Sequence, residues 1–226
     1  MSKHLSRDLD ALKQRILQMG RMVEVATDLA FSVISERKPE AAQRVIDGDR
    51  RVDLWEVETE EECLKILALH QPVAADLRFI VAVMKVNNDL ERMGDLAVNI
   101  AERATYLASH DPIEVPLDFA RMGDATRKML RDSLRALIEQ DTALARTVLA
   151  ADDEVDRINA EMFNALQTLM REKPETIKSA MHTISVSRHL ERIADLATNI
   201  AEDVVFMVEG EIIRHRTEDY LADRYE

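Results

Sequence analysis

Acidic side chains recur in pairs spaced i, i+4 at four places in the chain. The pairs are Asp49 with Asp53, Glu91 with Asp95, Asp152 with Asp156, and Glu191 with Asp195. Side chains at i and i+4 share one face of a helix, and two like charges there destabilise it by a few tenths of a kcal/mol. Carboxylate oxygens are the ligands that Mg²⁺, Ca²⁺, Mn²⁺ and iron accept. The spacing therefore predicts helix faces that could hold a hard cation.

Two of these pairs lie in a repeated stretch. Residues 90–102 and 190–202 are identical at ten of thirteen positions, with an offset of 100, and the Asp-x-x-x-Asp pairs recur at an offset of 103. A repeat of this length indicates a duplicated structural unit. At about 100° per residue, Glu91, Asp95 and Asn99 fall on the face opposite an apolar stripe. The acids of the two copies are therefore predicted to form two sites with the same role.

The acidic faces also have a simpler interpretation. A row of acids opposite an apolar stripe is typical of any soluble amphipathic helix. Basic residues close enough in sequence to form ion pairs with them are Arg50, Arg51, Arg92 and Arg192. The duplication favours cation binding over a merely solvated or salt-bridged face, because a solvated face would be free to exchange its charges between copies.

Long helices must position these acids. Prolines at 39, 72, 112, 116 and 174 divide segments with helical periodicity, and the apolar residues of segment 5–33 step alternately by four and three. The sequence predicts an all-α fold of six long helices in two pseudo-repeated three-helix bundles. The predicted domains are 1–110 and 111–213, followed by a polar tail, 214–226. Short connections favour antiparallel neighbours and an elongated molecule.

The composition of the chain excludes several classes of protein. The 226 residues are 46% hydrophobic and 32% charged, with a formal net charge of −13 and one cysteine, Cys63. A negative surface repels phosphate backbones, so a general nucleic-acid binder is disfavoured. The single cysteine rules out an internal disulfide and fits a reducing compartment. We find neither a signal peptide nor a run of about 18 apolar residues long enough to span a membrane.

Three motifs in order resemble one family. The Leu-Glu-Arg-x-x-Asp-x-x-x-Asn-Ile stretches, the Asp-x-x-x-Asp pairs and the segment 71–78 (Gln-Pro-Val-Ala-Ala-Asp-Leu-Arg) are similar to those of the PhoU family, from about residue 5 to 210. The resemblance implies a cytoplasmic negative regulator that contacts the ATPase of a phosphate-specific ABC transporter and a sensor histidine kinase. It also implies a homodimer that meets the membrane only through its partners.

The same resemblance implies metal sites. By position, the first would comprise Asp49, Asp53, Glu91 and Asp95, and the second Asp152, Asp156, Glu191 and Asp195, with Asn99 and Asn199 as outer ligands. Iron, Mn, Mg and Zn all remain open as the metal. One departure is that Glu56 of the first half corresponds to Asn159 of the second. We expect a regulator rather than an enzyme; the alternative is a metal-dependent hydrolase that uses the same carboxylates.

Overall fold

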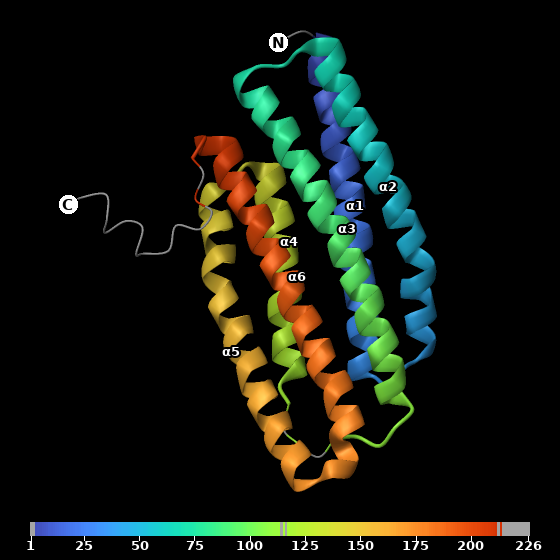
Figure 1. Ribbon diagram of the computed structural model, residues 1–226. Coiled ribbons are helices and arrows are strands. Elements are labelled where there is room, and N and C mark those ends of the chain that lie inside the picture. The colour runs from blue at the N-terminus through green and yellow to red at the C-terminus, as the bar shows by residue number, and fades with distance from the viewer. Residues whose placement is uncertain (1–2, 114, 116, 212, 214–226) are drawn as a thin grey trace, which may run out of the picture.

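The computed structural model describes residues 3–113, 115, 117–211 and 213, and in them the chain is helical (Figure 1). The helices are α1 (Lys3–Ser35), α2 (Glu40–His70), α3 (Ala74–Ala108), α4 (Phe119–Glu139), α5 (Thr142–Glu172) and α6 (Ile177–Glu209), with a 3₁₀ turn, η1 (Pro174–Thr176), before α6. No strand occurs among the described residues. The all-α prediction with six long helices is confirmed.

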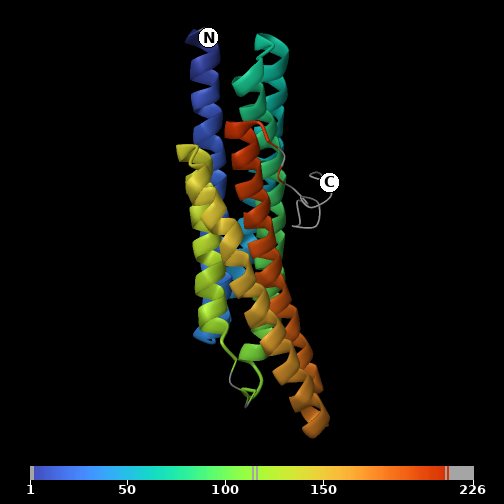
Figure 2. The ribbon, with the colours of Figure 1, turned by 90° about the vertical axis from the view of Figure 1, so that its left-hand side faces the viewer.

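The helices form two three-helix bundles that lie side by side. Helices α1, α2 and α3 pack on one another, as do α4, α5 and α6, and the bundles meet through α3 against α6 and α1 against α4. Helices α2 and α5 lie at the two outer edges in Figure 1, and Figure 2 shows the molecule elongated along its helices. The predicted pair of bundles is therefore present. The exact domain boundaries stay a prediction, and residues 214–226 lie outside the described part.

The connections follow from local chemistry. Pro39 precedes α2, and Gln71 ends it with a left-handed backbone (φ 46°), just before Pro72. Asp141 accepts a hydrogen bond from the backbone N–H of Leu144 at 2.9 Å and so caps the start of α5. The first helix ends at Ser35, a little before the predicted stop ahead of Pro39.

Glycines allow α1 and α4 to approach closely. A Cβ built on Gly20 of α1 would clash with the side chain of Leu134 on α4. A Cβ on Gly123 of α4 would clash with the ring of Phe31 on α1. Each helix therefore supplies a glycine where the other supplies a large apolar side chain, and this reciprocal contact joins the two bundles.

The contact between α3 and α6 also includes polar groups. Lys85 of α3 lies 3.1 Å from the Asp203 carboxylate of α6, which is 1% exposed. The guanidinium of Arg78 donates to the backbone oxygen of Met207 at 3.0 Å, at the carboxyl end of α6, where a positive charge is favourable. These bonds hold the two bundles in one relative position.

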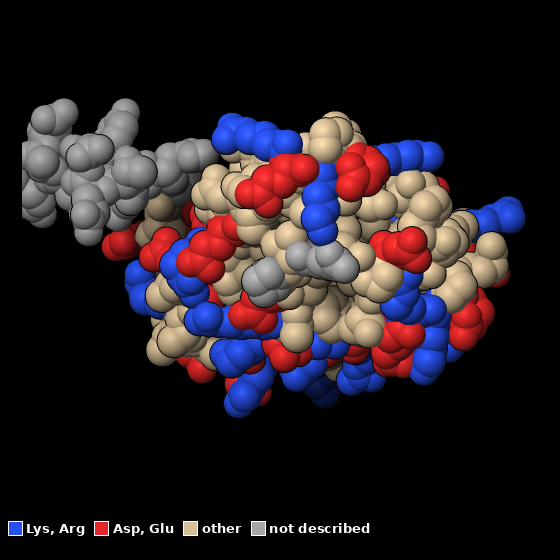
Figure 3. Space-filling model, turned by 90° about the horizontal axis from the view of Figure 1, so that it is seen from below, with Lys and Arg blue, Asp and Glu red and all other residues tan. Residues whose placement is uncertain are grey.

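Charges of both signs share the surface. The view from below shows Lys and Arg interspersed with Asp and Glu over the end of the molecule, so the net charge is not gathered into one field there (Figure 3). None of the described helices has the length and apolarity needed to cross a bilayer.

Candidate metal centres

The acids of the second bundle converge between α5 and α6. Asp152 and Asp156 extend from α5 and Asp195 from α6, and each offers one carboxylate oxygen such that these oxygens all lie within 4.8 Å of one another. Asp156 and Asp195 are exposed, whereas Asp152 is half-buried. One oxygen of Asp152, Oδ1, is buried with no hydrogen-bond partner among the described residues. An oriented oxygen without a donor beside two further carboxylates fits a hard cation.

Three carboxyl groups of this cluster have raised pKa values, because they are partly buried and repel one another. Burial first, then the charges of Asp156 and Asp195, raises the pKa of Asp152 to about 7. Burial and the charges of Asp195 and Asp156 likewise raise the pKa of Glu191. Asp195 has a raised pKa because of burial and Asp156. Glu191 is therefore electrostatically part of the cluster, although it is not among the three acids that approach within 4.8 Å.

The first bundle assembles its acids more loosely. Burial, followed by repulsion from Asp53 and Asp95, raises the pKa of Asp49 to about 6. The pKa of Glu91 is raised mainly by burial and then by several acids, among which Asp95 contributes most. Within the described part of the chain, no three acids of this bundle bring ligand atoms within 4.8 Å of one another. The predicted first site is thus a neighbourhood of like charges rather than a tight trio.

A glycine distinguishes the first cluster and was missed in the sequence. A Cβ built on Gly94 of α3 would lie 3.2 Å from Oδ1 of Asp49. The matching residue of the second copy is Ala194. Gly94 therefore leaves room for Asp49 to lie against α3. The sequence contains a sign of this difference, because position 94 is one of the three positions at which the repeated stretches differ.

The two predicted asparagines lie one turn beyond the acids. The side-chain amide of Asn99 donates to the backbone oxygen of Asp95 at 2.8 Å, so its nitrogen faces its own helix. Asn199 is half-buried at the matching position of α6. On the other side of the second cluster, Ser187 donates to the side-chain oxygen of Asn159 at 2.7 Å. The structure places both asparagines beside the acids, and their role as outer ligands stays a prediction.

The salt-bridged interpretation of the acidic faces is not supported. Of the four arginines near in sequence, Arg92 pairs with Asp89 at 3.5 Å, away from the cluster. Among the residues described, no Lys or Arg nitrogen lies within 4.0 Å of a carboxylate oxygen of either cluster. Arg192 acts on Glu191 and Asp195 only at longer range. The clusters therefore lack ion-pairing cations of their own.

The raised pKa values predict how the stability of the metal-free protein depends on pH. The folded state keeps protons on Asp49 and Asp152 at pH values where the unfolded chain has lost them, since their folded pKa values of about 6 and 7 exceed the ordinary 3.8. These two groups therefore stabilise the metal-free fold at low pH, and that contribution falls as pH rises from about 4 to about 7. The lowered pKa values of His182 and His189 act in the opposite direction.

The measurement is a thermal melt with chelator at pH 5 and pH 8, for the chain and for Asp49→Asn/Asp152→Asn. The chain should lose more stability than the variant between the two pH values. Equal losses would show that these carboxyl groups titrate normally.

The fold and the paired clusters together define an all-α protein with duplicated three-helix bundles and a group of acids on each. The family model of the PhoU domain matches residues 16–104 and 119–204, one match in each bundle. This chain belongs to the PhoU family.

Individual relatives cover almost the whole chain. A phosphate-specific transport system accessory protein PhoU homolog of Aquifex aeolicus is 42% identical over 212 residues, 94% of this chain and 96% of the relative. The accessory protein PhoU of Serratia marcescens is 34% identical, covering 98% and 93%. The crystal structure of PhoU from Pseudomonas aeruginosa superposes with a TM-score of 0.88 at 35% identity, covering 91% of this chain and 99% of that one.

Proposed function

We propose that this chain is a regulator of phosphate homeostasis that represses phosphate uptake and the phosphate-starvation response. The observation that carries the proposal is similarity along nearly the full length of both chains to relatives named phosphate-specific transport system accessory proteins. Similarity that is confined to one bundle would support the fold alone. Here the similarity covers both bundles.

The regulator acts through protein contacts in the cytoplasm rather than through catalysis. Its partners are the ATPase of the phosphate transporter and a sensor histidine kinase, and it meets the membrane only through them. The active form is a homodimer. Nucleic acid is not a partner, because the net charge of −13 opposes binding to a phosphate backbone.

Metal binding supports this role. The trio of Asp152, Asp156 and Asp195, with Glu191 beside it, fits an oxygen-preferring cation such as iron, manganese or magnesium, and zinc remains open. The looser first cluster offers the equivalent residues. A bound cation supplies positive charge, which offsets the burial and the mutual repulsion that raise these pKa values. It also links the two helices that carry the acids. The chain's own carboxylates thereby stiffen each bundle for docking.

A deletion strain tests the regulatory proposal. Without this chain, phosphate-scavenging genes should be expressed even in excess phosphate, because the repressing contact is lost, and the intact gene should restore repression. The measurement is reporter expression at high and low phosphate.

Normal repression in the deletion strain would contradict regulation. Metal-dependent turnover of a phosphoester by the purified protein, lost with the second cluster, would instead favour the hydrolase.

A further inference from the structure

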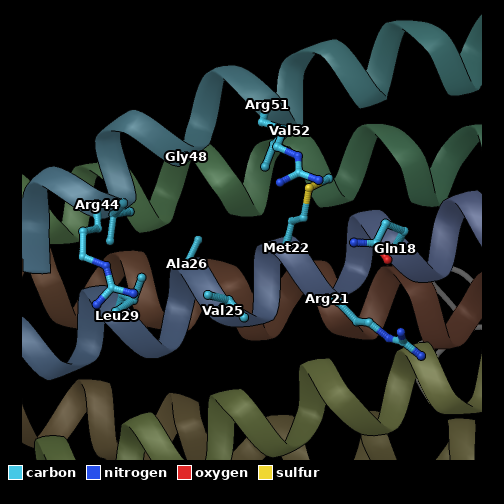
Figure 4. A pocket seen from close by; sticks show the side chains of 11 residues that line it. Gln18, Arg21, Met22, Val25, Ala26, Leu29, Arg44, Gly48, Arg51 and Val52 are labelled. Carbon is cyan, nitrogen blue, oxygen red and sulfur yellow. The ribbon is translucent and has the colours of Figure 1, made fainter.

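A groove of about 270 Å³ runs between α1 and α2 (Figure 4). Its floor is apolar and consists of Met22, Val25, Ala26 and Leu29 on α1. Val25 is 55% exposed, so the groove opens to solvent along one side. The lining residues of α1 extend from Gln18 to Leu29, which corresponds to about 16 Å, or three turns of helix.

Two arginines cross this groove without an acidic partner. Arg44 and Arg51 extend from α2 toward α1, and their guanidinium groups lie beside Leu29 and Met22 (Figure 4). No described carboxylate lies within the ion-pair distance of 4.0 Å from either guanidinium. The two guanidinium groups lie over the apolar floor of the groove. They are positioned to receive carboxylates from outside the chain.

Gly48 keeps the groove open. A glycine inside a helix costs about 0.5–1 kcal/mol relative to alanine. A Cβ on Gly48 would meet no atom within 4 Å, whereas a Cβ on Gly20, Gly94 or Gly123 would meet one at 3.2 Å or less. Close packing inside the chain therefore surrounds the other three helical glycines but not Gly48. Its missing side chain leaves space for a ligand between the two arginines.

The matching place in the second bundle carries different side chains. At an offset of 103, the two arginines and the glycine are replaced by Thr147, Glu154 and Ala151. Glu154 accepts a hydrogen bond from Arg121 of α4 at 2.7 Å, so α4 and α5 are tied together there. The acids therefore recur in both bundles, whereas the two arginines and the glycine of the groove do not recur in the second.

We propose that the α1–α2 groove docks an acidic amphipathic helix of a partner protein. Its apolar side chains would lie on Met22 and Leu29 and over Gly48, and its carboxylates would pair with Arg44 and Arg51. Amphipathic helices bind grooves in this way, with anchors at i, i+3, i+4 and i+7. The three-turn length of the floor matches such anchors. The inference goes beyond the proposed function by assigning a surface and the chemistry of what it binds.

Charge and shape disfavour other occupants. A two-fold contact between copies would bring the arginines of one groove against those of the other, which costs free energy. A fatty acid requires a site that buries most of its surface, and this groove is open at Val25. An acidic helix satisfies both the apolar floor and the two cations.

The test uses a labelled synthetic helical peptide with leucine anchors at these spacings and glutamates beside them, and a second peptide with lysine for glutamate. Fluorescence anisotropy with the full chain should show binding of the acidic peptide and at least about tenfold weaker binding of the lysine peptide. Arg44→Thr/Arg51→Thr should weaken the acidic peptide at least about tenfold, and Gly48→Leu should also do so by filling the groove. The matched control is Arg50→Thr, an exposed arginine of the same helix outside the groove, which should leave affinity unchanged.

The folded state should tolerate these changes, because Arg44 and Arg51 are exposed and a Cβ on Gly48 meets nothing within 4 Å. Thermal melts of each variant check this. Absence of acidic-peptide binding, equal affinity in the groove variants, or binding of oleate in place of the peptide would overturn the inference. So would a change of oligomeric state confined to the groove variants, which would assign the face to a second copy. None of these outcomes bears on phosphate regulation in the deletion strain.

Discussion

Replacing Asp152 by asparagine should stabilise the metal-free protein and remove about half of its metal binding. The pKa of this carboxyl group is raised to about 7, chiefly by burial and next by Asp156 and Asp195, so its ionised form is unfavourable in the folded state. Asparagine keeps the shape and removes the charge. Because the side chain is about half-exposed to water, which screens the repulsion, we expect a gain of about 1 kcal/mol, or roughly 2–4 °C in Tm.

The same change should weaken the second metal site at least about tenfold, since a neutral amide replaces a charged ligand. Equilibrium dialysis against Mn²⁺ with elemental analysis measures this, and the first cluster, left intact, supplies the remaining half. The matched control is Asp153→Asn, which removes the neighbouring exposed charge and should change neither quantity appreciably. A variant that is both less stable and fully metal-loaded would show that Asp152 is a structural residue and not a ligand.

The sequence predicted the helices because their signals are local. Prolines and helical periodicity predict the six elements, and each of them is present. The acids were predictable for a different reason, namely that duplication repeated them in register. Spacing places Asp152 and Asp156 on one face of α5, and Asp195 faces them from α6.

Features that depend on two helices at once were not predictable. Asp203 follows Glu202 in a polar pair and lies at the edge of the apolar stripe, about 120° from Glu191 on the wheel, yet it is 1% exposed. Its burial results from α3 covering that edge, which no single-helix pattern reveals. The open α1–α2 groove was not predictable for the same reason, because the role of a glycine inside a helix, such as Gly48, depends on what lies across from it on α1.

Lys85→Met should be among the most destabilising single changes that leave the apolar core intact. The ammonium of Lys85 lies 3.1 Å from the buried carboxylate of Asp203 and 5.2 Å from the centre of the Phe206 ring. Methionine retains the apolar packing and removes the charge. A buried carboxylate that loses its cation costs about 3–5 kcal/mol, and partial exposure of Lys85 lowers the expected loss to about 2–3 kcal/mol.

The chain provides its own control for this prediction. Lys65 and Glu62 form an ion pair of the same length, 3.1 Å, with 61% of the lysine side chain exposed. Lys65→Met should therefore change stability by no more than about 0.5 kcal/mol in urea or thermal unfolding. The double change Lys85→Met/Asp203→Asn should recover much of the loss, because the buried carboxylate charge is then removed together with the ammonium. Equal effects of Lys85→Met and Lys65→Met would mean that Asp203 tolerates burial without Lys85, and that this ion pair does not fix the position of one bundle against the other.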